Sequence, residues 1–265
     1  MTRVRCKRPN PEARLRLFCF PFAGGIGVYN SWYDELPPET RCATELCSIH
    51  LPGHEGNLQE TLFSRLSPLL NLLVPAVASY RNIPFAFFGH SMGALVSFEL
   101  ARQLRRQGLP SPVHMIVSGY RAPQLEDPHP AIHQLPDLEF QAQLRRLGGT
   151  PDGVLEDSEL MELLLPVLRA DFAVCENYTY LTEQPLDCSI TAYGGDKDAK
   201  VTRAELSAWR AQTRNSFSLR MFPGGHFFVQ TARILVLRTL AEDLKQVLRR
   251  LPQARRRLGA VDRGA

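Results

Sequence analysis

The feature that most constrains the fold is an apolar run of strand length that leads directly into Gly89-His90-Ser91-Met92-Gly93. A segment compatible with a helix follows at once. Strand, sharp turn and helix form the context in which a Gly-x-Ser-x-Gly motif lifts a serine hydroxyl above the edge of a sheet. The motif also occurs by chance in Gly-rich loops, but the buried strand before it favours a nucleophile at Ser91.

Length and composition limit the kind of protein this can be. A chain of 265 residues with 44% hydrophobic content predicts one sizeable globular domain. Its apolar runs are too short to cross a bilayer, and its charged first residues lack the apolar core of a signal peptide. We therefore expect a cytoplasmic protein that does not bind membranes.

The six cysteines form no C-x-x-C pair and have no histidines at metal-site spacing. This scatter favours reduced structural thiols over a metal site or a set of disulfides. The residues concerned are Cys6, Cys19, Cys42, Cys47, Cys175 and Cys188.

The formal net charge of +4 comes largely from the two ends of the chain. Residues 251–265 include an arginine run that is typical of a solvated, flexible tail. Nucleic-acid binding would require stacking aromatic residues among the basic ones or a known module, and the sequence offers neither. An acidic protein partner remains compatible with this charge.

Short apolar segments that end in turn residues alternate with amphipathic stretches, which predicts an α/β protein with a mainly parallel sheet. The helical stretches expected beside that sheet are Met92–Gln107 and Ala232–Leu251. The predicted strands are Leu15–Phe22, Glu45–Leu51, Phe85–Gly89, His114–Ser118, Ser189–Gly194 and Ser218–Phe222.

The alternation breaks at about residues 123–185, which carry no strong strand signal. Leu138–Leu147 and Glu159–Tyr178 are expected to be helices, with Pro166 kinking or interrupting the second. A single crossover connection between two parallel strands needs far fewer residues than this segment contains. We therefore interpret this segment as an inserted helical lid; ordinary crossover structure is the alternative.

A serine hydroxyl becomes a good nucleophile only when an imidazole accepts its proton and a carboxylate holds that imidazole. Downstream of Ser91, His226 follows a predicted strand in Pro-Gly-Gly-His, and Asp196 and Asp198 follow another. Each residue alone fits a turn or a surface loop. Their order, each at a strand end, predicts a catalytic triad of Ser91, Asp198 and His226, with Asp196 as the alternative acid.

A tetrahedral intermediate needs two backbone N–H donors directed at its oxyanion. The amide of Met92, directly after the nucleophile, is one candidate. The second is expected in the Gly-Gly loop after the first strong strand, at Ala23, with Phe22 as the alternative. The two glycines also fit a simple turn, and both interpretations can hold together.

The other histidines carry weaker signals. His90 lies inside the motif, and its side chain should point away from that of Ser91. His54 follows Leu-Pro-Gly near the same edge of the sheet, close enough to touch a substrate. His129 and His133 lie in a Pro-rich stretch and are expected to be exposed to solvent.

Together these motifs resemble those of the type II thioesterases, the stand-alone α/β-hydrolases that accompany polyketide synthases and nonribosomal peptide synthetases. Relatives act with animal fatty acid synthase. The resemblance spans nearly the whole chain in the expected order. The matching stretches are FCFPFAGG (18–25), LPGHEG (51–56), PFAFFGHSMGA (84–94), LRRLGGTP (144–151), LPVLRADF (165–172) and PGGHFF (223–228).

The resemblance implies an α/β-hydrolase domain at 14–250, between a flexible N-terminus (1–13) and the basic tail. It implies hydrolysis of acyl groups, stalled or aberrant ones included, from the phosphopantetheine thiol of carrier proteins. No other cofactor and no metal are expected. Where many relatives carry arginine, this chain has His54. The residues expected to line the acyl chamber from the lid are Leu163, Leu164, Val167 and Phe172.

Residue patterns alone predict only a serine hydrolase with a lid, since nothing in the spacing requires a thioester. The alternatives within the same fold are a medium-chain fatty acyl-carrier thioesterase and a small-molecule carboxylesterase. A catalytically silent carrier-binding protein is the alternative outside enzymes.

Overall fold

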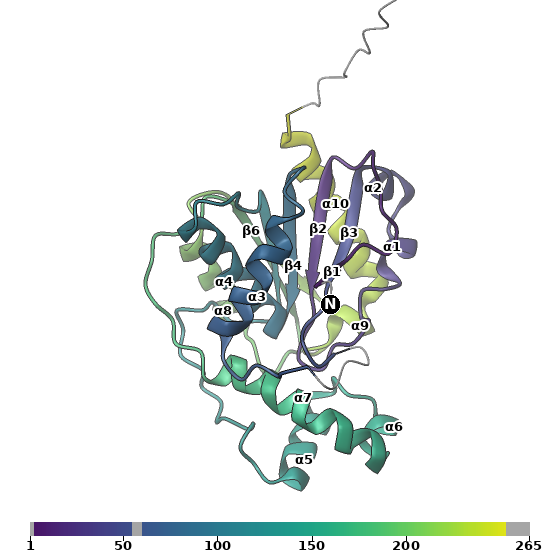
Figure 1. The fold of residues 1–265 in the computed structure, drawn as a ribbon, viewed down its shortest axis with the longest axis vertical. Coiled ribbons are helices and arrows are strands. Elements are labelled where there is room, and N and C mark those ends of the chain that lie inside the picture. The colour runs from purple at the N-terminus through teal and green to yellow at the C-terminus, as the bar shows by residue number, and fades with distance from the viewer. Residues whose placement is uncertain (1–2, 55–59, 253–265) are drawn as a thin grey trace, which may run out of the picture.

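The computed structural model describes residues 3–54 and 60–252. The part of the predicted basic tail from residue 253 onward lies outside these ranges. Within them, the chain forms a seven-stranded sheet in the order β1-β3-β2-β4-β5-β6-β7. Figure 1 shows this sheet between two layers of helices. The strands are β1 (Val4–Arg5), β2 (Leu15–Phe20), β3 (Thr44–Ile49), β4 (Phe85–His90), β5 (His114–Ser118), β6 (Ser189–Gly195) and β7 (Phe217–Phe222).

All strand pairs are parallel except β1 with β3. Every residue of β2, β4 and β5 is buried, because helices cover both faces of the sheet. That is why these strands read as continuous apolar runs. The α/β fold with a mainly parallel sheet is confirmed, and the predicted strands differ from the observed ones only at their ends.

Helices α3 (Leu66–Ala78), α4 (Met92–Arg106) and α8 (Arg203–Ser207) pack on one face of the sheet and share one hydrophobic core. Helices α1 (Trp32–Glu35), α9 (Phe228–Thr231) and α10 (Arg233–Arg250) cover the other face with a second core. A short helix α2 (Pro38–Ala43) packs beside α10, and the 3₁₀ helix η1 (Ala208–Gln212) follows α8. In the described residues, no helix is both long and apolar enough to cross a membrane.

Two helices differ from the sequence expectations because proline has different effects at different positions. Helix α3 contains Pro68 and Pro75, and we predicted no helix there, although six of its apolar residues are buried. Helix α7 (Ser158–Glu176) continues through Pro166, so the expected interruption is wrong, and the alternative of a kink stays a prediction. Pro166 is exposed, which places its ring on the solvent side of the helix. A helix tolerates a missing hydrogen bond best on that side.

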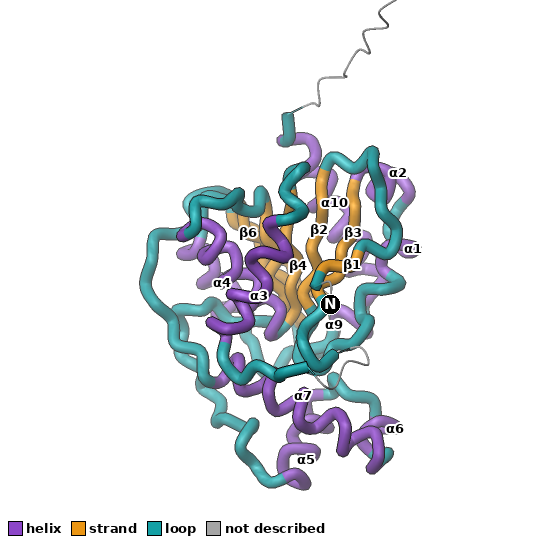
Figure 2. The backbone as a smooth tube through the Cα atoms, viewed as in Figure 1, coloured by secondary structure: helices purple, strands orange, loops and turns teal. Residues whose placement is uncertain are grey.

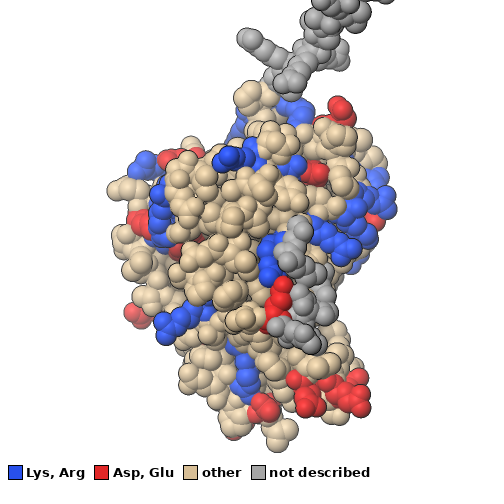
Figure 3. Space-filling model, viewed as in Figure 1, with Lys and Arg blue, Asp and Glu red and all other residues tan. Residues whose placement is uncertain are grey.

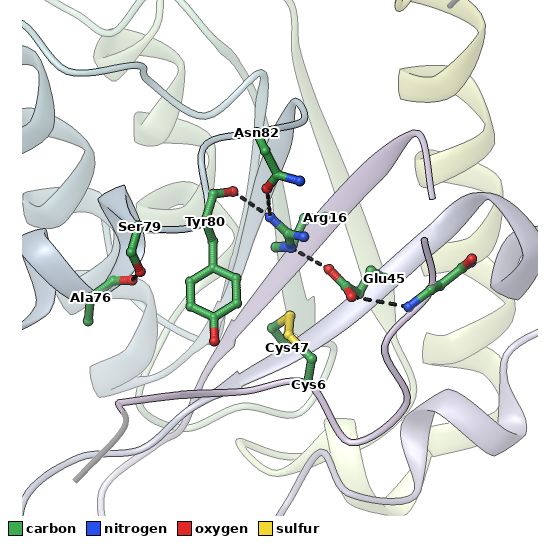
Figure 4. The surroundings of a disulfide bond; sticks show 9 residues. Cys6, Arg16, Glu45, Cys47, Ala76, Ser79, Tyr80 and Asn82 are labelled. Carbon is green, nitrogen blue, oxygen red and sulfur yellow. Dashed lines mark hydrogen bonds and ion pairs between the residues drawn. A yellow bond between two sulfur atoms is a disulfide. The ribbon is translucent and has the colours of Figure 1, made fainter. Parts of the chain in front are cut away.

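The N-terminal segment is more ordered than expected. The sequence predicts that residues 1–13 are flexible; residues 1 and 2 lie outside the described ranges, whereas Val4–Arg5 pairs with β3, and Cys6 forms a disulfide with Cys47 on that strand. Figure 4 shows this bond beside the Arg16–Glu45 ion pair. The expectation of reduced thiols is therefore wrong for these two cysteines. Arg5 lies opposite Ser48 in the ladder, so Cys6 and Cys47, the next pair along it, lie opposite each other. Their Cα atoms are 4.2 Å apart, although 41 residues separate them in the sequence.

Residues 123–185 form a helical unit of their own between β5 and β6. It contains α5 (Asp137–Leu147), α6 (Asp152–Leu155) and α7, which share a small separate core. Figures 1 and 2 show these helices beyond the carboxyl ends of the parallel strands, with loops between them and the sheet. In Figure 3, basic and acidic side chains are interspersed over the sheet domain, while acidic ones gather at the end of the unit near α6. We call residues 123–185 the lid.

Candidate active site

Ser91 occupies a strained turn between β4 and α4. It has φ 52° and ψ −120°, the single positive φ of a non-glycine residue in the described chain. Such a conformation costs about 1–3 kcal/mol and persists only where the surroundings enforce it. Here the Ser91 amide donates to the Ser118 carbonyl oxygen at 2.7 Å. A Cβ atom at Gly93 would lie 2.2 Å from the Phe20 carbonyl oxygen, so the motif's second glycine is required by close packing.

His226 follows β7 and reaches back to Ser91. Its Nε2 lies 3.1 Å from the Ser91 Oγ, and its Nδ1 lies 2.9 Å from Asp198 Oδ2. A carboxylate can only accept, so Nδ1 carries the proton and Nε2 is left with a lone pair for the serine hydroxyl. This arrangement can remove the hydroxyl proton as the oxygen attacks an electrophile.

The structure separates the two candidate acids. The Asp198 side chain is fully buried, and its Oδ1 accepts from the amides of Lys200 at 2.8 Å and Val201 at 3.3 Å. Asp196 is exposed, and its Oδ1 accepts from the Gly224 amide at 2.9 Å. Asp198 therefore orients the His226 ring, whereas Asp196 stabilises the loop that carries His226.

The two candidate oxyanion donors face the same cavity as Ser91, because Met92 and Ala23 both line it. Met92 is the first residue of α4, so its amide has no acceptor within the helix. In the loop after β2, the Gly24 amide donates to Asp171 and the Gly25 amide donates to the Phe22 carbonyl oxygen. These bonds leave Ala23 and Phe22 as the candidates for the second donor.

The cavity over Ser91 and His226 holds about 850 Å³ of empty space, part of it open to solvent. Of the four lid residues expected to line it, Phe172 does so, whereas Leu163, Leu164 and Val167 are not among the described lining residues. Phe172 and Leu168 are four residues apart and share a face of α7. Leu164, one turn before Leu168, packs against the lid core, Val167 is buried, and Leu163 is exposed. Leu144 and Leu147 of α5 complete the apolar lining.

His90 lies directly beneath the candidate base. It is fully buried, its ring centre is 5.3 Å from that of His226, and its Nδ1 lies 2.9 Å from the Ser118 Oγ. Burial lowers the pKa of His90 well below its ordinary value, and the neighbouring His226 lowers it further. A neutral ring below His226 adds no positive charge that would oppose protonation of the base.

Three other histidines differ from the sequence expectations. His54 is buried and contacts Asp171 on the lid, and it is not among the described residues that line the cavity. His129 is half-buried and lines the cavity, and His133 pairs with Glu176 of α7. No pattern in the sequence indicates these pairings, because each one joins segments that only the folded lid brings together.

Comparisons with known proteins place the chain in one family. The sequence profile of the family described as thioesterase domain matches residues 15–245. The gramicidin S biosynthesis protein GrsT of Aneurinibacillus migulanus is 45% identical over 240 residues, covering 90% of this chain and 92% of that protein. Thioesterase PikA5 of Streptomyces venezuelae is 36% identical over 253 residues, covering 95% and 88%.

Among solved structures, the type II thioesterase BorB from the borrelidin biosynthetic cluster superposes with a TM-score of 0.81 at 36% identity. The match covers 91% of this chain and 97% of that one. Profile, relatives and structure thus coincide over the same part of the chain, the part that contains the strained serine, the histidine and the aspartate. The chain belongs to the thioesterase domain family.

Proposed function

We propose that this protein is a stand-alone type II thioesterase that hydrolyses acyl groups, stalled or aberrant ones included, from the phosphopantetheine arm of carrier proteins in polyketide or nonribosomal peptide biosynthesis. The observation that carries the proposal is the hydrogen-bonded chain Ser91–His226–Asp198 at a lid-covered apolar cavity. The names of the relatives supply the substrate class, which the geometry alone does not specify.

In the first half of the reaction, the Ser91 oxygen attacks the thioester carbon while His226 Nε2 takes the hydroxyl proton. The negative charge that develops on the carbonyl oxygen is stabilised by the amides of Met92 and Ala23. When the intermediate collapses, the carbon–sulfur bond breaks and His226 returns its proton to the leaving thiolate. The products are an acyl ester on Ser91 and the free phosphopantetheine thiol of the carrier.

In the second half, His226 takes a proton from water as the water oxygen attacks the ester carbon. Collapse of that intermediate breaks the bond to the Ser91 oxygen, which recovers a proton from His226. The acyl group leaves as a carboxylic acid. Asp198 stays ionised throughout and stabilises the imidazolium that forms in each half.

The reaction needs no group bound by this chain, because the substrate itself carries the phosphopantetheine. Apolar side chains of α5 and α7 form part of the cavity lining and suit an acyl chain. Charged side chains line the same cavity, those of Arg121, Asp127, Glu176 and Lys200. The partner is the carrier domain that presents the thioester. We place the protein in the cytoplasm, where such carriers are loaded.

The decisive experiment compares kcat/KM on an acyl-carrier thioester, the matched pantetheine thioester and the matched oxygen ester. We expect the carrier thioester to be preferred. Ser91→Ala should lower kcat by several orders of magnitude, as loss of a triad member does, and should abolish labelling by a fluorophosphonate probe. Preference for the oxygen ester would indicate a carboxylesterase, and unlabelled wild-type protein would indicate a catalytically silent binding protein.

A further inference from the structure

One carboxylate of the lid reaches two loops of the sheet domain at once. Asp171, on α7, accepts from the Gly24 amide at 2.8 Å and lies 2.9 Å from His54 Nε2, both through Oδ2. The side chains of His54 and Asp171 are only 4% and 9% exposed. Burial makes this bridge sensitive to the loss of any member, because an unpaired polar group inside a protein is costly.

The hydrogen bonds of His54 specify its charge. Its Nδ1 lies 3.0 Å from the Pro52 carbonyl oxygen, and its Nε2 faces the Asp171 carboxylate. Both partners are acceptors, so both ring nitrogens must donate, and the ring is an imidazolium. Burial alone would lower the pKa of His54, but the charge and the hydrogen bond of Asp171 raise it above its ordinary value.

Helix α7 also packs closely against the loop after β2. Gly24 has φ +70°, and a Cβ atom there would lie 2.5 Å from Leu168 Cδ2, one turn before Asp171 on the same helix. A side chain at residue 24 would displace Leu168 and would strain a backbone of positive φ, so glycine favours this close approach of the loop to α7. The Gly24 amide that Asp171 holds belongs to the peptide unit directly after Ala23, the candidate oxyanion donor. The Gly25 amide, bonded to the Phe22 carbonyl oxygen, closes the turn from the other side.

We propose that Asp171 and His54 are positioning residues for the oxyanion donor: the imidazolium fixes the carboxylate, the carboxylate fixes the Gly24 peptide, and Ala23 is thereby directed into the cavity when the lid helix is seated. This inference rests on the proposed hydrolysis and on Ala23 as the second donor. It adds a direct coupling between the lid and the catalytic centre.

In the described ranges 3–54 and 60–252, two other titratable groups lie close to this pair. Cys175, one turn further along α7, is kept as a neutral thiol because burial raises its pKa. Glu60 pairs with Arg3 at 2.7 Å and accepts from the Gly53 backbone beside His54. Neither group places a second positive charge at Asp171, so among the described residues His54 is the cation whose loss would release the carboxylate.

The test uses the full-length protein and an acyl-pantetheine thioester, so it does not depend on the carrier. Asp171→Leu removes both hydrogen bonds. Loss of one oxyanion donor costs about 10²–10³ in kcat. Because Asp171→Leu misdirects the donor without removing it, we expect kcat to fall by about 10- to 100-fold with KM changed by less than about threefold. Asp137→Asn, which removes the negative charge of the exposed Arg169–Asp137 pair on the same lid, is the control and should leave kcat unchanged.

Substitutions of His54 distinguish positioning from simple support of the fold. His54→Gln should lower kcat, and His54→Arg, whose charge persists at all working pH values, should restore it. In the wild type, kcat should decline as pH rises through the raised pKa of His54, and His54→Arg should remove this alkaline decline. If Asp171→Leu does not fold, these two variants decide the question.

A decline that persists in His54→Arg, or variants that raise KM while kcat stays constant, would overturn the inference. Failure of the proposed function would look different. The wild type would then not prefer the carrier thioester, while the effects of these variants on pantetheine thioester or oxygen ester would remain.

Discussion

Asp198→Asn is the substitution for which the structure specifies an outcome most fully. Asp198 Oδ1 accepts from two backbone amides, those of Lys200 and Val201. In the variant, only the carbonyl oxygen of the new amide can occupy that position, because an NH2 group cannot accept. The NH2 group must therefore face His226 Nδ1, at the place where Oδ2 now lies 2.9 Å away.

This orientation reverses the tautomer of the base. Facing a donor, Nδ1 of His226 must become an acceptor, so the proton moves to Nε2, the atom that faces the Ser91 hydroxyl at 3.1 Å. That nitrogen can no longer accept the serine proton. A reversed tautomer in a serine triad lowers kcat by about 10⁴-fold, or about 5 kcal/mol of transition-state stabilisation. KM should change little, because no contact that lines the cavity is removed.

The assay is steady-state hydrolysis of an acyl-pantetheine thioester, with thermal unfolding measured in parallel. Asp196→Asn is the matched control: its side chain can still accept from the Gly224 amide through the amide oxygen. We expect the control to stay within about threefold of wild type in kcat. A kcat for Asp198→Asn above about a tenth of wild type, with the fold intact, would show that Asp198 does not set the tautomer of His226. A larger loss in Asp196→Asn would identify Asp196 as the acid.

Two further predictions concern stability and specificity. Burial lowers the pKa of His114 to about 4 from the 6.5 of an unperturbed histidine. The buried neutral ring therefore stabilises the fold fully above pH 6.5, and this stabilisation is lost as pH falls towards 4, because the unfolded chain binds the proton first. Between pH 6.5 and pH 4, the free energy of unfolding should fall by about 3 kcal/mol less in His114→Gln than in the wild type. Urea unfolding at several pH values measures this, and the same dependence of unfolding free energy on pH in both proteins would contradict it. Leu147→Trp should narrow the cavity and raise the preference for short over long acyl chains, measured as the ratio of their kcat/KM values, by about tenfold or more. Leu163→Trp, at a residue 52% exposed, is the control and should leave this ratio unchanged. Equal effects of the two substitutions would mean that α5 does not bound the acyl chain.

Much of the sheet domain could be predicted because its signals are local. Buried parallel strands read as apolar runs with turn residues at their ends, and a turn such as that at Ser91 needs small neighbours that are visible in the sequence. The order of Ser91, Asp198 and His226 along the chain, each after a strand, was enough to propose a triad. The sequence does not distinguish Asp196 from Asp198, because both follow the same strand. The backbone of the loop after β6 directs the Asp198 carboxylate to His226 and the Asp196 carboxylate to the Gly224 amide.

The lid and the edge of the sheet were harder to predict, for a physical reason. Which apolar residues of α7 line the cavity depends on how that helix is rotated on its neighbours, and its sequence is apolar enough to allow several rotations. The Cys6–Cys47 bond depends on the register of two strands far apart in the chain. Local residue patterns specify six of the seven strands, the turn at Ser91 and the chemical types at the strand ends. Which distant groups meet, as Asp171 meets His54 and Gly24, follows from packing between segments that no local pattern encodes.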